Sequence, residues 1–347
     1  MNTEIGEGRP VYVIAEVSAN HNQDYDEAER IIRAAKEAGA DAIKLQTYTP
    51  DTMTIDCSKP CFTIKGTSWA GKNLYSLYSE AYTPWEWQPK LINLARELGL
   101  HAFSTPFDIK SVDFLEDIDV PAYKVASFEI VDIPLLRRIG KTGKPVIMST
   151  GMATIAEIEE AVGVLREEGT SEIALLKCTS AYPARPEDMN LRTIPNLSET
   201  YQVAVGVSDH TLGIVVPIAA VMLGACIVEK HLTLSRAKLG PDSAFSLEPQ
   251  EFQAMVDAVR TAEKAIGHVQ YGATEREIES RIFRRSLFVV RDVKRGEVFT
   301  AENVRCIRPG YGLHPRYFDE IVGKTAACNI DRGTPLAPEH VVDGELV

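Results

Sequence analysis

The stretches Val203-Ala-Val-Gly-Val-Ser-Asp-His210 and Cys226-Ile-Val-Glu-Lys-His231 decide the fold of this chain. Each is a short apolar run that ends in polar or ionisable residues. The same pattern occurs earlier at residues 11–16, 42–46, 101–105, 122–129, 146–149 and 173–180. Ordinary strand-to-loop transitions are also polar, but eight in succession favour a parallel barrel, which carries its chemistry at the carboxyl ends of its strands.

Amphipathic helical stretches separate these apolar runs. The clearest lie at residues 26–38, 85–98, 155–168, 214–223 and 249–266. The strands read as continuous apolar runs, as expected where helices cover a parallel sheet. About eight such units fill the roughly 250 residues of a TIM (β/α)8 barrel, and we predict this α/β fold for residues 1–268. A doubly wound open sheet is the alternative, but no Gly-x-Gly-x-x-Gly motif follows the first strand.

Three segments depart from this rhythm. Residues 49–83 are too long for a simple strand-to-helix loop and are rich in aromatic residues, so we expect a lid or binding loop without regular structure. Residues 269–283 are charged and are predicted to be a linker. Beyond them, residues 293–304 are echoed by residues 330–341, each reading as a strand, an Arg-Gly turn and a short helical turn. Residues 284–347 are therefore predicted to form a small, mostly β domain that docks on a barrel.

The bulk composition excludes several classes of partner. The 347 residues carry a formal net charge of −12, which leaves no basic surplus for nucleic acid. We expect no membrane partner, because no apolar run is long enough to cross a bilayer. With no export signal and six scattered cysteines, we expect a cytoplasmic protein with reduced thiols. A small anionic ligand would need a local cationic focus, for which Lys44, Lys124 and Arg308 are candidates.

Two histidines suggest a metal site. His210 and His231 follow consecutive predicted strands, and neighbouring strands lie about 4.8 Å apart. Two imidazoles so placed can bind one divalent ion, although a structural role fits either histidine taken singly. The remaining histidines offer no third ligand at a fixed offset, so water or substrate would complete the coordination sphere.

Short segments, in order along nearly the whole chain, resemble the sialic acid synthase family. They are Ala15-Glu-Val-Ser-Ala-Asn-His-Asn22, Lys44-Leu-Gln-Thr47, Ser104-Thr-Pro-Phe107, Lys124-Val-Ala-Ser-Phe-Glu129, Ser149-Thr-Gly-Met152, Ser208-Asp-His-Thr211, Glu229-Lys-His231 and Gly240-Pro-Asp242. The tail, with Arg308-Pro-Gly-Tyr-Gly312, resembles that family's antifreeze-like (SAF) domain. Within the family, residues 77–85, 240–247 and 308–315 most resemble the pseudaminic acid synthases.

This resemblance implies an enzyme that joins phosphoenolpyruvate to an N-acylated amino sugar. The finer likeness implies a pseudaminic acid synthase acting on 2,4-diacetamido-2,4,6-trideoxy-L-altrose and releasing phosphate by C–O cleavage. The alternative is an N-acetylneuraminate or legionaminic acid synthase acting on N-acetylmannosamine or a related N-acyl hexose. Ser180 and Ser243 depart from the neuraminate-type pattern, which commonly has Asn and His there, and Ser243 favours the trideoxy sugar.

The resemblance also implies roles for individual residues. His210 and His231 would hold Mn²⁺ or Mg²⁺. The phosphate of phosphoenolpyruvate would be bound by Lys124, Ser127, Ser149 and Ser180, its carboxylate by Lys44, Thr105 and Ser208, and the sugar by Gln46, Glu129, Tyr182 and Asp242. Arg308 would reach the N-acyl group from a neighbouring subunit, which implies a domain-swapped homodimer.

Physical chemistry supports these roles independently. Two lysines and several hydroxyl donors form a charge-assisted cradle for a multiply charged anion. A divalent ion polarises an aldehyde carbonyl as a Lewis acid. A carboxylate near C2 of the enolpyruvate can stabilise positive charge and accept a proton from water. Glu16 and Glu129 are both candidates, and we favour Glu16 as the base and Glu129 on the sugar side.

Other interpretations stay open at the level of sequence. Lys44 and Lys124 also suit ion pairs, the serines also suit helix caps, and the two glutamates also suit buried salt bridges. A different enzyme class would be a Schiff-base aldolase that uses Lys124 or Lys230 on free pyruvate. A non-catalytic alternative makes the tail a carbohydrate-binding module on an inactive barrel.

Overall fold

The computed structural model describes residues 4–66 and 69–342. The chain divides into two compact units, residues 1–267 and residues 268–347. Each unit has a hydrophobic core of its own.

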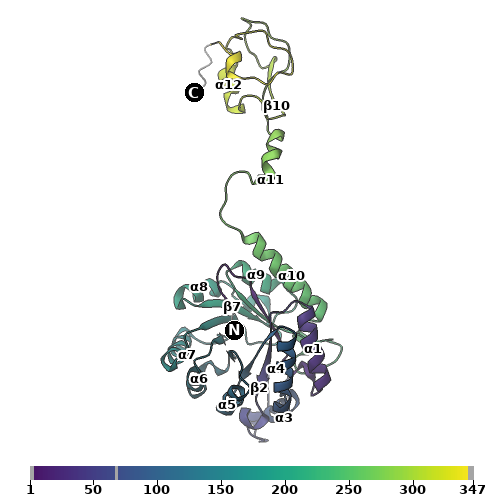
Figure 1. Ribbon diagram of the computed structural model, residues 1–347, viewed down its shortest axis with the longest axis vertical. Coiled ribbons are helices and arrows are strands. Elements are labelled where there is room, and N and C mark those ends of the chain that lie inside the picture. Colours follow the sequence, from purple (N-terminus) through teal and green to yellow (C-terminus); the bar gives the residue numbers. More distant parts are fainter. Residues whose placement is uncertain (1–3, 67–68, 343–347) are drawn as a thin grey trace. The chain divides into compact units, whose positions relative to one another are not determined.

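The first unit is a barrel. Within the described part of the chain, eight parallel strands pair in sequence order, and the last pairs with the first. The strands are β1 (Tyr12–Glu16), β2 (Ala42–Thr47), β3 (His101–Pro106), β4 (Tyr123–Val125), β5 (Val146–Ser149), β6 (Ile173–Cys178), β7 (Ala204–Asp209) and β8 (Ile227–His231). Helices surround them (Figure 1). The predicted TIM barrel is confirmed.

Most strands extend further at their carboxyl ends than the apolar runs predicted. In β8 the ladder continues through Glu229, Lys230 and His231, and Glu16 of β1 lies directly opposite His231. The polar residues that we expected just past the strands are therefore largely inside them. Because side chains in a strand alternate between its two faces, neighbouring residues here point to opposite sides of the barrel wall.

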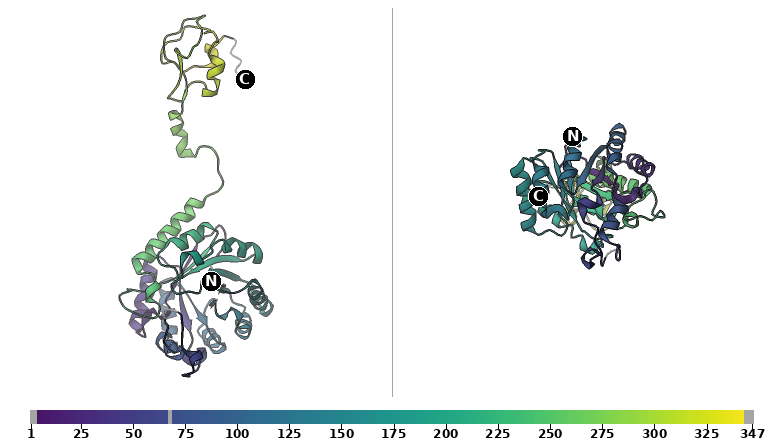
Figure 2. Two further views of the ribbon diagram at one scale, coloured as in Figure 1. Left: turned by 180° about the vertical axis from the view of Figure 1, so that it is seen from behind. Right: turned by 90° about the horizontal axis from the view of Figure 1, so that it is seen from below.

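The helices of the barrel include all five predicted amphipathic stretches, and the described structure adds others at residues 109–117, 133–140 and 193–201. Together they are α1 (Tyr25–Glu37), α4 (Gln88–Glu97), α5 (Ile109–Asp117), α6 (Ile133–Gly140), α7 (Ile155–Glu168), α8 (Thr193–Tyr201), α9 (Val215–Met222) and α10 (Pro249–Ile266). The single helix predicted at residues 85–98 is instead a 3-10 turn (Trp85–Trp87) followed by α4. Pro89 lies in the first turn of α4. The first turn of a helix tolerates proline, because the backbone N–H groups there have no intrahelical acceptor and the missing N–H of proline is not needed. Helix α10 packs beside α1 and α9 (Figure 2).

The segment at residues 49–83 is more regular than predicted. It contains α2 (Pro50–Met53), a 3-10 turn (Pro60–Phe62) and α3 (Leu74–Ala81). The Asn73 side chain accepts a hydrogen bond from the Tyr75 N–H and caps α3. Such caps make short helices possible in a segment whose hydrophobic pattern is too brief to reveal them.

The second unit contains the antiparallel pair β9 (Ser286–Val289) and β10 (Val304–Ile307) and the short helix α12 (Phe318–Ile321). Val293 and Ile330, which begin the two copies of the echoed sequence, exchange two backbone hydrogen bonds. Residues predicted as a linker include α11 (Glu275–Ile278) and a 3-10 turn (Glu279–Phe283). In neither unit does the described structure contain a helix that is both long and apolar enough for a membrane span.

Candidate active site

A cavity of about 360 Å³ lies at the carboxyl ends of the barrel strands. Most of the side chains that the sequence predicted for the site line it. They are Glu16, Lys44, Gln46, Lys124, Ser127, Glu129, Ser149, Tyr182, Ser208, His210, His231 and Asp242. The fold therefore brings together residues that lie up to 226 positions apart in the chain, from Glu16 to Asp242.

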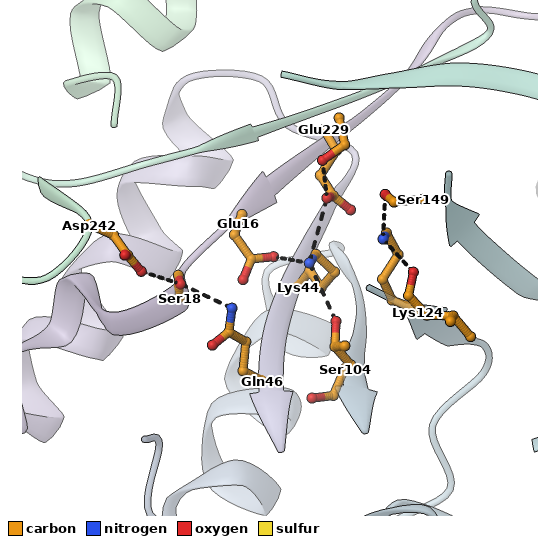
Figure 3. A network of polar contacts seen from close by, with 12 residues as sticks. Glu16, Ser18, Lys44, Gln46, Ser104, Lys124, Ser149, Glu229 and Asp242 are labelled. Atoms are coloured by element: carbon orange, nitrogen blue, oxygen red, sulfur yellow. Dashed lines mark hydrogen bonds and ion pairs between the residues drawn. The ribbon is translucent and has the colours of Figure 1, made fainter. Parts of the chain in front are cut away.

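Lys44 occupies the most highly charged part of the cavity. Its Nζ lies 2.5 Å from Glu16 Oε2 and 3.6 Å from Glu229 Oε1, and it donates a 3.4 Å hydrogen bond to Thr105 Oγ1. Figure 3 shows Lys44 pointing toward both carboxylates. Burial lowers the pKa of Lys44, but the two carboxylates outweigh burial and raise the pKa overall. Lys44 is thus both an ion-pair partner and a cation facing the cavity.

Of the two candidate bases, Glu16 is fully buried, and Glu129 is half-buried with its Oε2 shielded from solvent. Burial raises the pKa of Glu16 to about 7, against the opposing effect of Lys44. Burial likewise raises the pKa of Glu129 to about 7, and its Oε2 has no hydrogen-bond partner among the described residues. A carboxyl with a pKa near neutrality suits proton transfer at neutral pH.

The residues predicted to bind phosphate form two adjacent pairs. Lys124 Nζ donates to Ser149 Oγ at 2.7 Å, and Ser127 Oγ lies 2.7 Å from Ser180 Oγ. Gly151 packs against the second pair, since a Cβ there would lie 2.4 Å from Ser127 Cβ and 2.7 Å from Ser180 Oγ. Only glycine permits this approach, at a φ of +49°. Sequence reasoning assigned Gly151 no role.

The two histidines line the same cavity, with their rings in an edge-to-face contact. Their ring centroids are 5.3 Å apart. His210 Nδ1 donates to the Thr179 carbonyl oxygen at 3.1 Å, which leaves Nε2 as the nitrogen able to bind a metal. His231 Nδ1 is buried without a partner in the described structure, and burial lowers the pKa of His231 well below its usual value.

These residues fit a divalent metal ion. Both histidines offer an imidazole nitrogen to the cavity, and a neutral imidazole is the form that binds metal. Among the described residues, no group of three or more His, Cys, Asp or Glu is arranged to hold an ion. Two imidazoles would therefore hold the metal with its other positions open to water or substrate.

Two of the residues predicted to face the sugar, Gln46 and Asp242, are linked through Ser18. Ser18 Oγ donates to Asp242 Oδ2 at 2.5 Å, and Gln46 Nε2 donates to Ser18 Oγ at 3.1 Å. The Tyr182 ring packs against the rings of Trp69 and His210. The distances between ring centroids are 5.5 Å to Trp69 and 4.4 Å to His210. Ser18 was missed by sequence reasoning, although it lies inside the Ala15–Asn22 motif that carried the resemblance.

One wall of the cavity is apolar. It consists of Tyr48, Met53, Ile64, Leu74, Leu77, Tyr78, Ala81, Phe107 and Phe128. Most of these residues come from the segment between β2 and α4, which supports the prediction of a binding loop there. We call this set the apolar wall.

Three predicted residues do not line the cavity. Thr105 is hydrogen-bonded to Lys44, and Ser180 is hydrogen-bonded to Ser127, so each contacts a residue that does line the cavity. Arg308 belongs to the second unit, where it is exposed. Glu229, in contrast, lines the cavity and accepts a 2.8 Å hydrogen bond from Ser208 Oγ. Its i, i+2 spacing from His231 was the signal, because it puts both side chains on the same face of β8.

Lys230 is not available as a Schiff-base lysine. Its side chain is fully buried, pairs with Asp209 and is absent from the cavity lining. Alternation along β8 sends it to the outer face of the barrel, opposite to Glu229 and His231. Lys124 is the only one of the two aldolase candidates that reaches the cavity formed by the described residues.

Family models and several relatives match this chain. Residues 31–271 match the NeuB family. The chain belongs to the NeuB family. Residues 284–342 match the SAF domain, so the predicted family and its antifreeze-like tail are both confirmed.

Two pseudaminic acid synthases match almost the whole length of this NeuB-family chain. It is 46% identical over 328 residues to a pseudaminic acid synthase of Campylobacter jejuni, covering 94% of this chain and 96% of the relative. It is 43% identical over 334 residues to a pseudaminic acid synthase of Helicobacter pylori, covering 96% and 98%. The crystal structure of N-acetylneuraminic acid synthetase from Leptospira borgpetersenii matches with a TM-score of 0.72 at 33% identity, covering 80% of this chain and 93% of that one.

Proposed function

We propose that this chain is a pseudaminic acid synthase. It condenses phosphoenolpyruvate with 2,4-diacetamido-2,4,6-trideoxy-L-altrose and releases phosphate by C–O cleavage. The observation that carries the proposal is a cavity in which two lysines, two histidines and two carboxyls with pKa values near 7 meet an apolar wall. The high identity to pseudaminic acid synthases over nearly the whole chain supports the same assignment.

The two lysines bind the anionic substrate in this proposal. Lys124, with Ser149, Ser127 and Ser180, holds the phosphate, and Lys44, with Thr105 and Ser208, holds the carboxylate. Lys124 donates to Ser149 and to the Val125 carbonyl before substrate arrives, so it is already oriented. Preorganised donors of this kind stabilise charge without a reorganisation cost.

The carboxyl groups of Glu16 and Glu129 have different roles in this proposal. Glu16 accepts a proton from the water that adds to C2, and its neighbour Lys44 stabilises the ionised form. Glu129 lies on the sugar side, close to the apolar wall through Phe128. A divalent ion, Mn²⁺ or Mg²⁺, held by His210 and His231 would supply Lewis-acid polarisation of the sugar aldehyde.

The apolar wall favours a sugar with little polar surface. A 6-deoxy sugar with two N-acetyl groups presents three methyl groups. Each buried methyl group gains about 0.8 kcal/mol relative to water. A hydroxyl in the same place would be buried without a hydrogen bond, which costs about 1–3 kcal/mol. The wall therefore distinguishes the trideoxy diacetamido sugar from N-acetylmannosamine.

A domain-swapped homodimer and a cytoplasmic location complete the proposal. Arg308 is an exposed cation on a unit separate from the barrel, and we propose that it completes a partner subunit's site. The segments that follow β4, β5 and β7 expose the apolar side chains of Phe128, Val131, Met152, Leu212 and Val215, which suit contact with a second copy. All six cysteines are free, as in a reducing compartment. We retain residues 1–268, 269–283 and 284–347 as barrel, linker and SAF domain.

A phosphate-release assay tests the activity. We expect one phosphate per nonulosonic acid formed, with the trideoxy diacetamido sugar preferred over N-acetylmannosamine and over the legionaminic acid precursor. Chelation with EDTA should abolish turnover, and Mn²⁺ should restore it. Preference for N-acetylmannosamine would favour the neuraminate alternative. Borohydride trapping of pyruvate on Lys124, with no phosphate released, would replace the proposal with a Schiff-base aldolase.

A further inference from the structure

Behind the two histidines, on the outer face of the barrel wall, lies a buried ion pair with no role in the chemistry above. Asp209 and Lys230 are direct neighbours across β7 and β8. Both side chains are fully buried, and Lys230 Nζ donates to Asp209 Oδ2. Asp209 immediately precedes His210, and Lys230 immediately precedes His231.

The same pair also forms hydrogen bonds with Thr211, the residue that follows His210. The Thr211 N–H donates to Asp209 Oδ1 at 3.0 Å, and Thr211 Oγ1 donates to Asp209 Oδ2 at 3.1 Å. Lys230 Nζ donates to the Thr211 carbonyl oxygen. All the polar groups of Thr211 are thereby bonded to one buried pair. The backbone on both sides of His210 is held against β8.

Isolated buried ion pairs are poor sources of stability. Desolvation of the two charges often exceeds their attraction, and a pair of apolar residues of similar volume is frequently as stable. The pair also contributes nothing to the cavity, which neither residue lines. The pair can instead orient neighbouring side chains. Fixing Asp209 and Lys230 on the outer face also fixes the side chains that alternate with them on the inner face.

We propose that the Asp209–Lys230 pair is a positioning device for the metal-binding histidines. It locks β7 to β8 at the residues that carry His210 and His231, and it holds the turn at Thr211 so that the imidazoles converge. Asp209, Lys230 and Thr211 are positioning residues that touch neither substrate nor metal. This inference rests on the proposed role of His210 and His231 as metal ligands.

The test separates positioning from stability. Mn²⁺ binding to the full chain is measured by electron paramagnetic resonance without substrates, together with thermal unfolding. The double variant Asp209→Leu/Lys230→Met replaces the pair with apolar residues of similar size. We expect it to unfold cooperatively near the wild-type temperature but to bind Mn²⁺ about 10- to 100-fold more weakly, as for other residues that orient metal ligands. Mn²⁺ affinity within twofold of wild type in the folded variant would overturn the proposal.

Two further variants keep the test decisive. Arg260→Met breaks an ion pair with Asp41 at the opposite end of the barrel, and its Mn²⁺ affinity should equal that of the wild type. If the double variant does not fold, the nearly isosteric Asp209→Asn takes its place, and unchanged Mn²⁺ affinity there would equally overturn the proposal. His210→Ala reports on the metal site itself. Wild-type Mn²⁺ affinity in that variant would refute the proposed metal ligands rather than their positioning.

Discussion

Lys124 shows how burial and charge combine in a single residue. It is 1% exposed, yet its ammonium faces the cavity, and within the described structure its hydrogen-bond acceptors, Ser149 Oγ and the Val125 carbonyl, are both neutral. Burial lowers the pKa of Lys124, although Glu229 partly opposes this. A cation that lacks a carboxylate within hydrogen-bonding distance is strongly attracted to a phosphate, because the phosphate replaces neutral partners with a charged one.

Replacing Lys124 with methionine tests its role in binding phosphoenolpyruvate. We expect Lys124→Met to raise KM for phosphoenolpyruvate about 10- to 100-fold, since a hydrogen bond to a charged group is worth about 1.5–3 kcal/mol. Initial rates of phosphate release at varied phosphoenolpyruvate measure this. Lys177→Met is the matched control, because Lys177 is also on a barrel strand, β6, but does not line the cavity. Equal KM values in both variants would contradict the assignment.

Glu129 makes stability depend on pH. Its pKa is about 7 in the folded protein against 4.5 when unperturbed, so between these values the folded state keeps a proton that the unfolded state has lost. The free energy of unfolding therefore falls as pH rises from 4.5 to 7. Glu129→Gln removes the carboxyl whose ionisation destabilises the folded state at high pH. We expect it to stabilise the barrel by about 3 kcal/mol at pH 8 but by less than about 1 kcal/mol at pH 5.

Calorimetry of the barrel transition at the two pH values measures this difference. Glu160→Gln, on the exposed face of α7, controls for the loss of one negative charge. A stabilisation by Glu129→Gln that is equal at pH 5 and pH 8 would show that the Glu129 carboxyl is not desolvated.

At the scale of elements, the segment between β2 and α4 contributes most of the apolar wall. Helix α3 presents Leu77 to the cavity and Ser76 to solvent. We expect Leu77→Asn to lower kcat/KM for the trideoxy sugar about 10-fold, because a buried contact with a methyl group is lost. The same variant should lower kcat/KM for N-acetylmannosamine much less.

Competition between the two sugars in a phosphate-release assay measures that ratio. Ser76→Asn puts the same side chain on the exposed face of the same helix and should leave the ratio unchanged. If Leu77→Asn lowers kcat/KM equally for both sugars, the apolar wall does not select the substrate.

At the scale of the whole molecule, the barrel and the second unit have separate hydrophobic cores. The barrel should therefore fold without residues 268–347. If Arg308 completes a partner subunit's site, the truncated barrel should retain its circular dichroism spectrum but lose more than about 100-fold in kcat/KM, as expected when a charged substrate contact is removed. Full activity of the truncated barrel would exclude a role for Arg308.

Subunit complementation tests whether Arg308 acts in trans. At phosphoenolpyruvate concentrations well below the raised KM of Lys124→Met, Arg308→Ala and Lys124→Met should each be nearly inactive alone. After mixing and subunit exchange, half of the dimers are hybrids with one intact site each, so activity should recover to about a quarter of the wild-type value. No recovery, despite subunit exchange shown by light scattering or mass spectrometry, would place Arg308 in its own subunit's site.

The sequence by itself determined the barrel and most of its cavity. Apolar runs ending in polar residues predicted the strands, and helical periodicity predicted helices such as α7 and α10 to the residue. These features depend on interactions between residues close in the chain, so a linear pattern reveals them. The family motifs are also short local segments. They predicted the site residues Glu16, Lys44, Lys124, His210 and His231.

Only the tertiary structure decided which way each side chain faces and what surrounds it. Lys230 and Glu229 are adjacent in sequence, yet one lies behind the wall and the other in the cavity. Leu77 and Trp69 join a site built from strands far from them in the chain. The pKa values of Glu16 and Glu129 likewise depend on burial. Facing and burial arise from closure of the barrel and from strand register, which couple residues across the whole chain and leave no local signal.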